Sequence, residues 1–220
     1  MKLLKLDLVS DVVCPWCYIG FKRLQIAMHA LQDEIELEID WRPFELNPQM
    51  PPEGELLSEH IARKYGASPE RRKQSQLQMA EIGQQLGIRF AFSEDRRIYN
   101  TFNAHRVLYW ARAQGRQTDF ALALFHEYFT ESNNPAAPEI LIRVADQLGM
   151  DGKTVADICA SDRFAEEVRA EQRQFLDSGV QAVPAFIINQ RYLISGAQDP
   201  LTLENALRQI AAKDSIEVAE

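Results

Sequence analysis

The sequence Cys14-Pro15-Trp16-Cys17 decides the fold of this chain. It is a CxxC pair that follows a short apolar segment, residues 3–9, and precedes a helix-like segment, residues 18–31. A CxxC pair between a strand and a helix is typical of a redox dithiol. Cys14 would begin that helix, where unpaired N–H groups and the macrodipole favour an anion. Such an environment stabilises a thiolate, which is the reactive form of cysteine.

The residues of the motif have different predicted roles. Disulfide exchange requires a thiolate that attacks, a mixed disulfide, and a second thiol that releases the product. Because the two cysteines stand three residues apart across a helix start, we expect Cys14 to be the exposed nucleophile and Cys17 the sheltered resolving thiol. Pro15 removes a backbone N–H and Trp16 adds an aromatic rim beside the sulfurs. We therefore assign both of these residues to substrate binding.

A structural zinc site is the main alternative for the two cysteines. Zinc would need two further Cys or His ligands at matching spacing, and the sequence has neither a second CxxC nor an HxxxH. We expect no metal and no organic cofactor, because the dithiol is itself the redox group. The third cysteine, Cys159, stands alone and is predicted to be a buried small residue.

Composition narrows the class of protein. The chain has 220 residues, a net charge of −8 and a pI of about 5.1, which argue against nucleic acid and anionic membranes as partners. No apolar run approaches the ~20 residues of a membrane-spanning helix. Lys5 and Asp7 interrupt any signal-peptide core before the CxxC, so we expect a cytoplasmic protein.

Periodicity predicts the element order βαβ, then a helical insert, then ββα. Strands are predicted over residues 3–9, 35–44, 183–188 and 191–194. Helices are predicted over residues 18–31, 56–65, 69–86, 101–114, 120–129, 138–148, 154–159, 163–176 and 201–212. The insert begins in a proline-rich stretch that follows the second strand.

Val183 and Pro184 open the third predicted strand of the core. A cis peptide bond there would leave the backbone of Val183 exposed beside the dithiol, where an extended substrate could pair with it. The alternative is an ordinary trans proline at a strand start, since cis bonds are about 5–6% of X–Pro bonds. The residues alone favour the trans bond, and we assign Val183 and Pro184 to substrate binding.

Four parts of the sequence together resemble a known family. They are residues 11–20 (DVVCPWCYIG), 41–48 (WRPFELNP), 100–106 (NTFNAHR), and 179–186 (GVQAVPAF) with 194–198 (ISGAQ). The pattern resembles the thioredoxin fold, and its insertion resembles the DsbA-like branch, in particular the FrnE-type group of predicted dithiol–disulfide isomerases. The resemblance implies that Pro184 is cis and contacts the Cys14 side, and that a substrate groove lies between the core and the insert.

The fold class expected from this resemblance is α/β, a thioredoxin fold (βαβ…ββα) with a large all-helical insertion. Residues 1–47 and 176–220 would form the thioredoxin-like domain, and residues 48–175 the helical insertion domain. The implied function is that of a protein disulfide oxidoreductase or isomerase of the DsbA family, acting on disulfide-containing proteins, peptides or small molecules.

A related group suggests the alternative function. The chain is also similar to the kappa-class glutathione transferases and 2-hydroxychromene-2-carboxylate isomerases, which share the insert and the Trp-Arg-Pro-Phe region. Those enzymes typically have Ser where this chain has Cys14, so the presence of Cys14 and Cys17 favours disulfide exchange, with glutathione as a redox partner. A third hypothesis is a peptide-binding or chaperone module that keeps the dithiol as a relic.

Other polar residues have less specific predictions. His105 lies in a predicted helix, where it either faces the substrate groove and assists proton movement, the role to which it is assigned, or is a packed histidine. Asp11 precedes the active-site turn, where it would either cap the turn or act on Cys14, and a structural role is favoured. Arg96 and Arg97 are expected to be solvent-exposed rather than to bind an anion such as glutathione.

Overall fold

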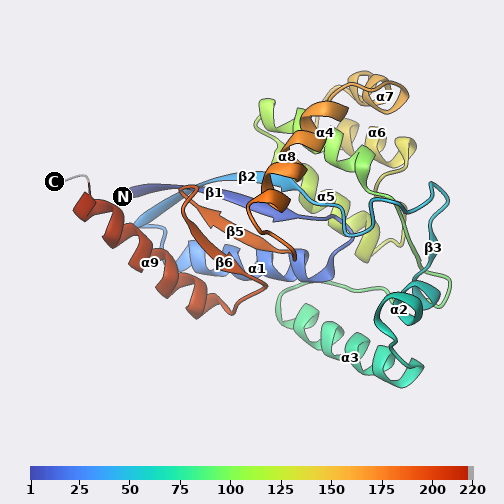
Figure 1. The fold of residues 1–220 in the computed structure, drawn as a ribbon, viewed down its shortest axis with the longest axis horizontal. Helices are drawn as coiled ribbons and strands as arrows, with labels where there is room; N and C mark the ends of the chain where they lie inside the picture. The colour runs from blue at the N-terminus through green and yellow to red at the C-terminus, as the bar shows by residue number, and fades with distance from the viewer. Residues whose placement is uncertain (218–220) are drawn as a thin grey trace.

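The order of elements expected from the sequence is confirmed in the computed structural model, which describes residues 1–217 (Figure 1). The main sheet consists of β1 (Lys2–Ser10), β2 (Ile35–Pro43), β5 (Ala185–Ile188) and β6 (Tyr192–Ser195). The helices are α1 (Pro15–Ala30), α2 (Leu57–Tyr65), α3 (Pro69–Gln85), α4 (Phe102–Ala113), α5 (Gln117–Phe129), α6 (Pro138–Gln147), α7 (Gly152–Ala160), α8 (Ala165–Asp177) and α9 (Pro200–Glu217).

Strand β1 lies inside the sheet, which has the order β2-β1-β5-β6. It pairs in parallel with β2, which returns through α1, and antiparallel with β5. Its alternating side chains Leu4, Leu6 and Leu8 are buried, as expected for a strand inside a sheet. Strand β1 therefore runs through the centre of the fold and ends directly before the turn that carries the CxxC pair.

The insertion between β2 and β5 contains helices α2 to α8, and it also contains a short β ribbon. Strands β3 (Glu55–Leu56) and β4 (Arg97–Ile98) pair antiparallel. The expectation of a purely helical insertion misses this ribbon, because two-residue strands are too short to show a period-2 pattern. The domain boundaries at residues 47/48 and 175/176 stay predictions, and residues 218–220 lie outside the described part of the chain.

Aromatic side chains join the insertion to the sheet and to α1. Tyr18, the residue after the CxxC pair, stacks on Phe125 of α5 with ring centroids 4.9 Å apart. Trp41 of β2 packs against the same Phe125 ring at 5.8 Å and against Phe21 of α1 at 4.8 Å. These contacts fix the start of α1 against both the sheet and the insertion.

A single glutamine covers the outer edge of β2. The buried Gln117 side chain accepts a hydrogen bond from the Trp41 backbone N–H and donates one to the Trp41 carbonyl, both at 2.9 Å. It also donates to the Leu108 carbonyl at 3.1 Å. The primary amide thus supplies the backbone partners that a further strand would otherwise provide.

Ion pairs connect the same strand to α4 and α8. Arg112 of α4 forms a bidentate pair with Glu171 of α8, at 2.8 and 3.0 Å, and donates to the Trp41 carbonyl at 3.2 Å. Arg42 of β2 also reaches Glu171, at 3.1 Å, and pairs with Asp40. The polar face between β2 and the insertion is therefore a network of partly buried charges rather than a set of isolated surface pairs.

The expectation for Arg96 is wrong. Only 6% of Arg96 is exposed, and its guanidinium lies over the rings of Tyr128 and Phe129, at 4.4 and 4.9 Å from their centroids. It donates to the carbonyls of Ala91 and Tyr128. The guanidinium group is flat and weakly hydrated, so it can stack on aromatic rings inside the protein. The positive charge of Arg96 was therefore not sufficient to predict an exposed side chain.

Within residues 1–217, no helix is both long enough and apolar enough to cross a membrane. The longest helix there, α9, has 18 residues and includes Glu204, Arg208 and Lys213.

Replacing Gln117 by Leu tests the cover over β2. The substitution keeps the side-chain volume but leaves the Trp41 N–H without a partner, so the free energy of unfolding should fall by about 1–3 kcal/mol. Urea denaturation measures this change. Gln78→Leu on the exposed face of α3 is the matched control and should change stability by less than about 0.5 kcal/mol. Equal effects of the two substitutions would contradict the role of Gln117.

Candidate active site

Cys14 is the N-cap residue of α1 and has an extended backbone conformation. Its carbonyl accepts the first hydrogen bonds of the helix from Cys17 and Tyr18, at 3.1 and 3.4 Å. The first turn of α1 contains no acidic residue, and Pro15 occupies the first helical position. The positive end of the helix is thus free to act on the Cys14 sulfur, as the sequence predicted.

The two cysteines are free thiols in contact with one another. Cys17 is completely buried, and desolvation, followed by the hydrogen bond and charge of Cys14, raises the pKa of its thiol. Cys14 is only 4% exposed, which differs from the expected exposed nucleophile. Its sulfur is covered because the residues 183–184 loop packs against it, a contact between distant parts of the chain.

The loop before β5 supplies that cover. The Val183–Pro184 peptide bond is cis, as the resemblance implied. The Cys14 thiol donates to the Val183 carbonyl with a sulfur–oxygen distance of 3.8 Å. A hollow of about 540 Å³ opens beside this loop, lined by residues 179–185 together with Leu193, Ser195 and Gly196. The structure therefore brings Cys14, Val183 and Pro184 together next to an open surface.

Two aromatic side chains lie at the outer side of the dithiol. Trp16 is 39% exposed, whereas Pro15 is partly covered. Tyr65, at the end of α2, is exposed, and partial burial together with the charge of Cys14 raises the pKa of its phenol. The end of α2 is therefore near Cys14, and the insertion contributes to the rim of the site.

His105 does not lie at this rim. It is buried on the inner side of the active-site turn, with Nε2 3.7 Å from Oδ1 of the fully buried Asp11. The assignment of His105 to the substrate groove is therefore wrong, because α4 packs its inward face against the turn after β1. Asp11 is held by the backbone N–H groups of Leu46 and Val13, at 2.8 and 3.4 Å, which agrees with the structural role favoured for it.

Gly20 is a residue of the site that the sequence reasoning missed. It lies in the middle of α1, and a Cβ atom there would lie 3.0 Å from Cγ of Pro184 and 3.3 Å from Cζ of Phe186. A glycine inside a helix costs stability relative to alanine, so its presence in residues 15–30 was a usable signal of a close contact. Its missing side chain lets α1 approach the Pro184 loop.

Metal ligands do not converge in the part of the chain that the structure describes. No group of three or more His, Cys, Asp and Glu side chains within residues 1–217 could hold a metal ion. The described residues of the site include two adjacent thiols, Cys14 at a helix N-terminus and Cys17 buried behind it.

Comparisons with known proteins agree with this geometry. The sequence matches the family model described as the DSBA-like thioredoxin domain over residues 5–208. The crystal structure of probable DsbA oxidoreductase SCO1869 from Streptomyces coelicolor is similar with a TM-score of 0.86 and 29% identity, covering 94% of this chain and 89% of that chain.

Two more distant structures share the fold alone. A 2-hydroxychromene-2-carboxylate isomerase has a TM-score of 0.72 at 17% identity and covers 96% of this chain and 98% of its own. The cytosolic disulfide reductase DsbM from Pseudomonas aeruginosa, solved with GSH, has a TM-score of 0.61 at 16% identity, with coverage of 93% and 98%.

Substituting Gly20 tests the contact between α1 and the Pro184 loop. Gly20→Val should displace the loop and lower the free energy of unfolding by about 1–3 kcal/mol, because the added methyl groups overpack the contact. Cys14 should then react faster with iodoacetamide than in the unchanged protein, since its cover has moved. Ala30→Val, on the exposed end of the same helix, is the control and should leave the alkylation rate unchanged.

Proposed function

This chain belongs to the DSBA-like thioredoxin domain family, and from that premise we propose that it is a thiol–disulfide oxidoreductase or isomerase acting through Cys14 and Cys17. The observation that carries the proposal is the position of the two thiols. Cys14 caps the N-terminus of α1 beside the Val183 carbonyl, and Cys17 is buried directly behind it. This is the arrangement that a two-step exchange needs.

In the first step, the Cys14 thiolate attacks one sulfur of a substrate disulfide. A bond forms between Cys14 and that sulfur, and the other substrate sulfur leaves as a thiolate. In the second step, Cys17 loses its proton and attacks the Cys14 sulfur of the mixed disulfide, which releases the remaining substrate thiolate. The substrate is reduced by two electrons and the Cys14–Cys17 pair is oxidised to a disulfide. Isomerisation uses the first step and its reversal.

The substrate would lie across the cis-proline loop. Val183 offers its backbone next to Cys14, and the adjacent hollow is lined by residues 179–185 together with Leu193, Ser195 and Gly196. Contacts to backbone groups do not select particular side chains, which suits disulfide-containing proteins and peptides of varied sequence. Trp16 and Pro15 would contact the substrate on the other side of the sulfur.

Neither a metal nor an organic cofactor is part of this proposal, because the dithiol itself carries the two electrons. We propose glutathione as the redox partner that restores the Cys14–Cys17 pair to the redox state it had before the exchange. We propose the cytoplasm as the location of the protein. Support comes from the cytosolic disulfide reductase DsbM from Pseudomonas aeruginosa, which has the same fold and was solved with GSH.

Single cysteine substitutions test the two assigned roles. Cys14→Ser should abolish the reduction of insulin disulfides, because the attacking sulfur is lost. Cys17→Ser should retain the first step and accumulate a mixed disulfide, visible as a mass increase. Cys159→Ser, on α7, removes a half-buried thiol away from the motif and should leave activity unchanged. Insulin reduction that survives Cys14→Ser would overturn the proposal.

The direction of electron flow follows from the reduction potential, measured by equilibrating the protein in glutathione buffers. A potential of about −120 to −200 mV would mark an oxidant or isomerase, and one near about −270 mV a reductase. Failure of the two cysteines to form a reversible disulfide would count against either role.

The similarity to a 2-hydroxychromene-2-carboxylate isomerase favours a second candidate, glutathione-dependent transfer or isomerisation. In that chemistry Cys17 has no resolving role. The candidate therefore predicts saturable glutathione binding and a transferase or isomerase activity that survives Cys17→Ala. Suppression of aggregation that is indifferent to Cys14→Ala would instead indicate a peptide-binding module.

A further inference from the structure

The proposed exchange leaves one proton without an acceptor. Cys17 is fully buried, and burial raises the pKa of its thiol. It must nevertheless lose that proton before its sulfur can attack the mixed disulfide. Since Cys17 lies behind Cys14 and away from solvent, an acceptor has to reach it from the interior of the protein.

Ser10 is a polar side chain on that inner side. It is the last residue of β1, it is 4% exposed, and its hydroxyl lies close enough to the Cys17 sulfur to lower the pKa of that thiol. Apart from this contact with Cys17, no hydrogen-bond partner for Ser10 Oγ is found among the described residues. A buried hydroxyl without such a partner lowers the stability of the folded protein, so Ser10 is expected to have a reason for its position.

His105 carries a second buried polar atom of this kind. Its Nε2 also lacks a hydrogen-bond partner within the described chain. The separation of 3.7 Å from Asp11 Oδ1 is too long for a hydrogen bond but short enough for a strong charge interaction. The Asp11 carboxylate is fully buried and held by backbone N–H groups, so its position beside the imidazole is fixed.

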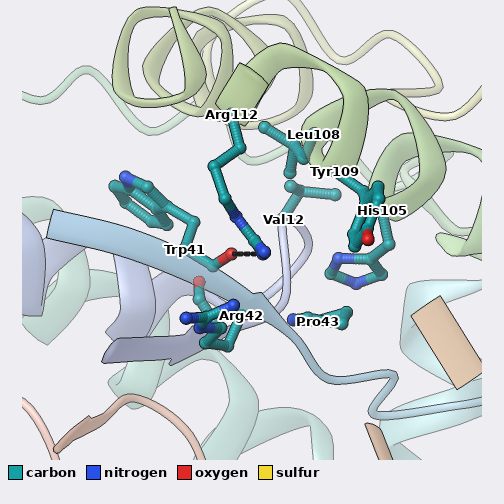
Figure 2. A pocket seen from close by; sticks show the side chains of 9 residues that line it. Val12, Trp41, Arg42, Pro43, His105, Leu108, Tyr109 and Arg112 are labelled. Atoms are coloured by element: carbon teal, nitrogen blue, oxygen red, sulfur yellow. Dashed lines mark hydrogen bonds between the residues drawn. The ribbon is translucent and has the colours of Figure 1, made fainter. Parts of the chain in front are cut away.

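Ser10 and His105 line the same cavity. Figure 2 shows this cavity between β2 and α4, with the His105 ring near Pro43 and the Arg112 side chain reaching the Trp41 carbonyl. Its volume is about 290 Å³ including the open mouth, and its narrow interior leaves room for about one water molecule. A water in that space would find two otherwise unpaired polar atoms, which is the usual reason for a buried water.

We propose that Ser10, one bound water and His105 form a proton relay that serves Cys17. The inference rests on the proposed function, because it explains how the resolving thiol of that function ionises. Ser10 passes its hydroxyl proton to the water and takes the thiol proton of Cys17, while the water passes a proton to Nε2 of His105. The Cys17 thiolate then attacks Cys14, and the imidazolium returns its proton to solvent through the mouth of the cavity.

The remaining charges around His105 are largely balanced among themselves. Arg42 and Arg112 line the cavity, and both are paired with Glu171. Other titratable groups on the elements packed around the relay include Asp7, Asp40, Arg106, Tyr109, Tyr128, Arg96, Cys14 and Cys17. The arginines that line the cavity are paired with carboxylates, and the Asp11 carboxylate lies 3.7 Å from Nε2 of His105.

The reaction with dithiobis(nitrobenzoate) separates the two steps in one experiment. Attack by Cys14 releases the first nitrothiobenzoate and leaves a mixed disulfide, and attack by Cys17 releases the second. Stopped-flow absorbance should show that Ser10→Ala and His105→Asn slow the second release at least about tenfold. A general base typically contributes about 10²-fold or more to a rate, so a tenfold loss is the minimum expected. Both substitutions should leave the first release within about twofold, and the exposed-histidine control His126→Asn should leave both releases unchanged.

The pH profile distinguishes a relay from a structural effect. In the unchanged protein, the rate of the second release should rise much less than tenfold per pH unit, because the relay supplies a proton acceptor other than hydroxide. In the variants it should keep rising about tenfold per pH unit, because only hydroxide remains as an acceptor below the raised pKa of Cys17. Ser10→Ala removes a single oxygen atom and keeps the test available if His105→Asn does not fold.

The outcomes separate the two proposals. A second release with the same rate and pH profile in Ser10→Ala or His105→Asn as in the unchanged protein overturns the relay and leaves the disulfide-exchange function standing. Absence of a second release in the unchanged protein overturns the function itself, and the relay with it.

Discussion

The fold depends on how closely α1 approaches the loop before β5. Gly20 permits that approach, because any side chain there would meet Pro184 and Phe186. Tyr18 stacks on Phe125, and this contact holds the start of α1 against the insertion. The start of α1, which carries Cys14, is therefore located by contacts with both the Pro184 loop and the insertion. The insertion is part of the site's framework as well as a cover for the sheet.

The site also divides its two cysteines between two environments. Cys14 faces the Val183 carbonyl, whereas Cys17 faces Ser10 and the interior. Both cysteines lie at the start of α1, and residues three apart on a helix share a face. The same short motif can in this way present one thiol to a substrate and keep its partner from reacting with solvent.

Local signals in the sequence predicted the elements and the dithiol, because strand alternation, helix periodicity and the CxxC spacing are all short-range. Val183 and Pro184 were recognisable only together with the distant CxxC pair. The β3–β4 ribbon, the burial of Arg96 and the inward position of His105 were not predictable in the same way, because each depends on contacts between residues far apart in the chain. Gly20 was predictable in principle, since a glycine inside a helix needs a steric reason.

The amide of Gln117 has a consequence for the protein in concentrated solution. An uncovered strand edge offers unpaired N–H and C=O groups to other chains, and such edges start intermolecular sheets. By occupying the backbone of Trp41, Gln117 withdraws the C-terminal part of the outer edge of β2 from that process. A strand of another chain that approaches this edge finds the N–H and C=O groups of Trp41 already paired, so this side chain protects the sheet from being extended by aggregating chains.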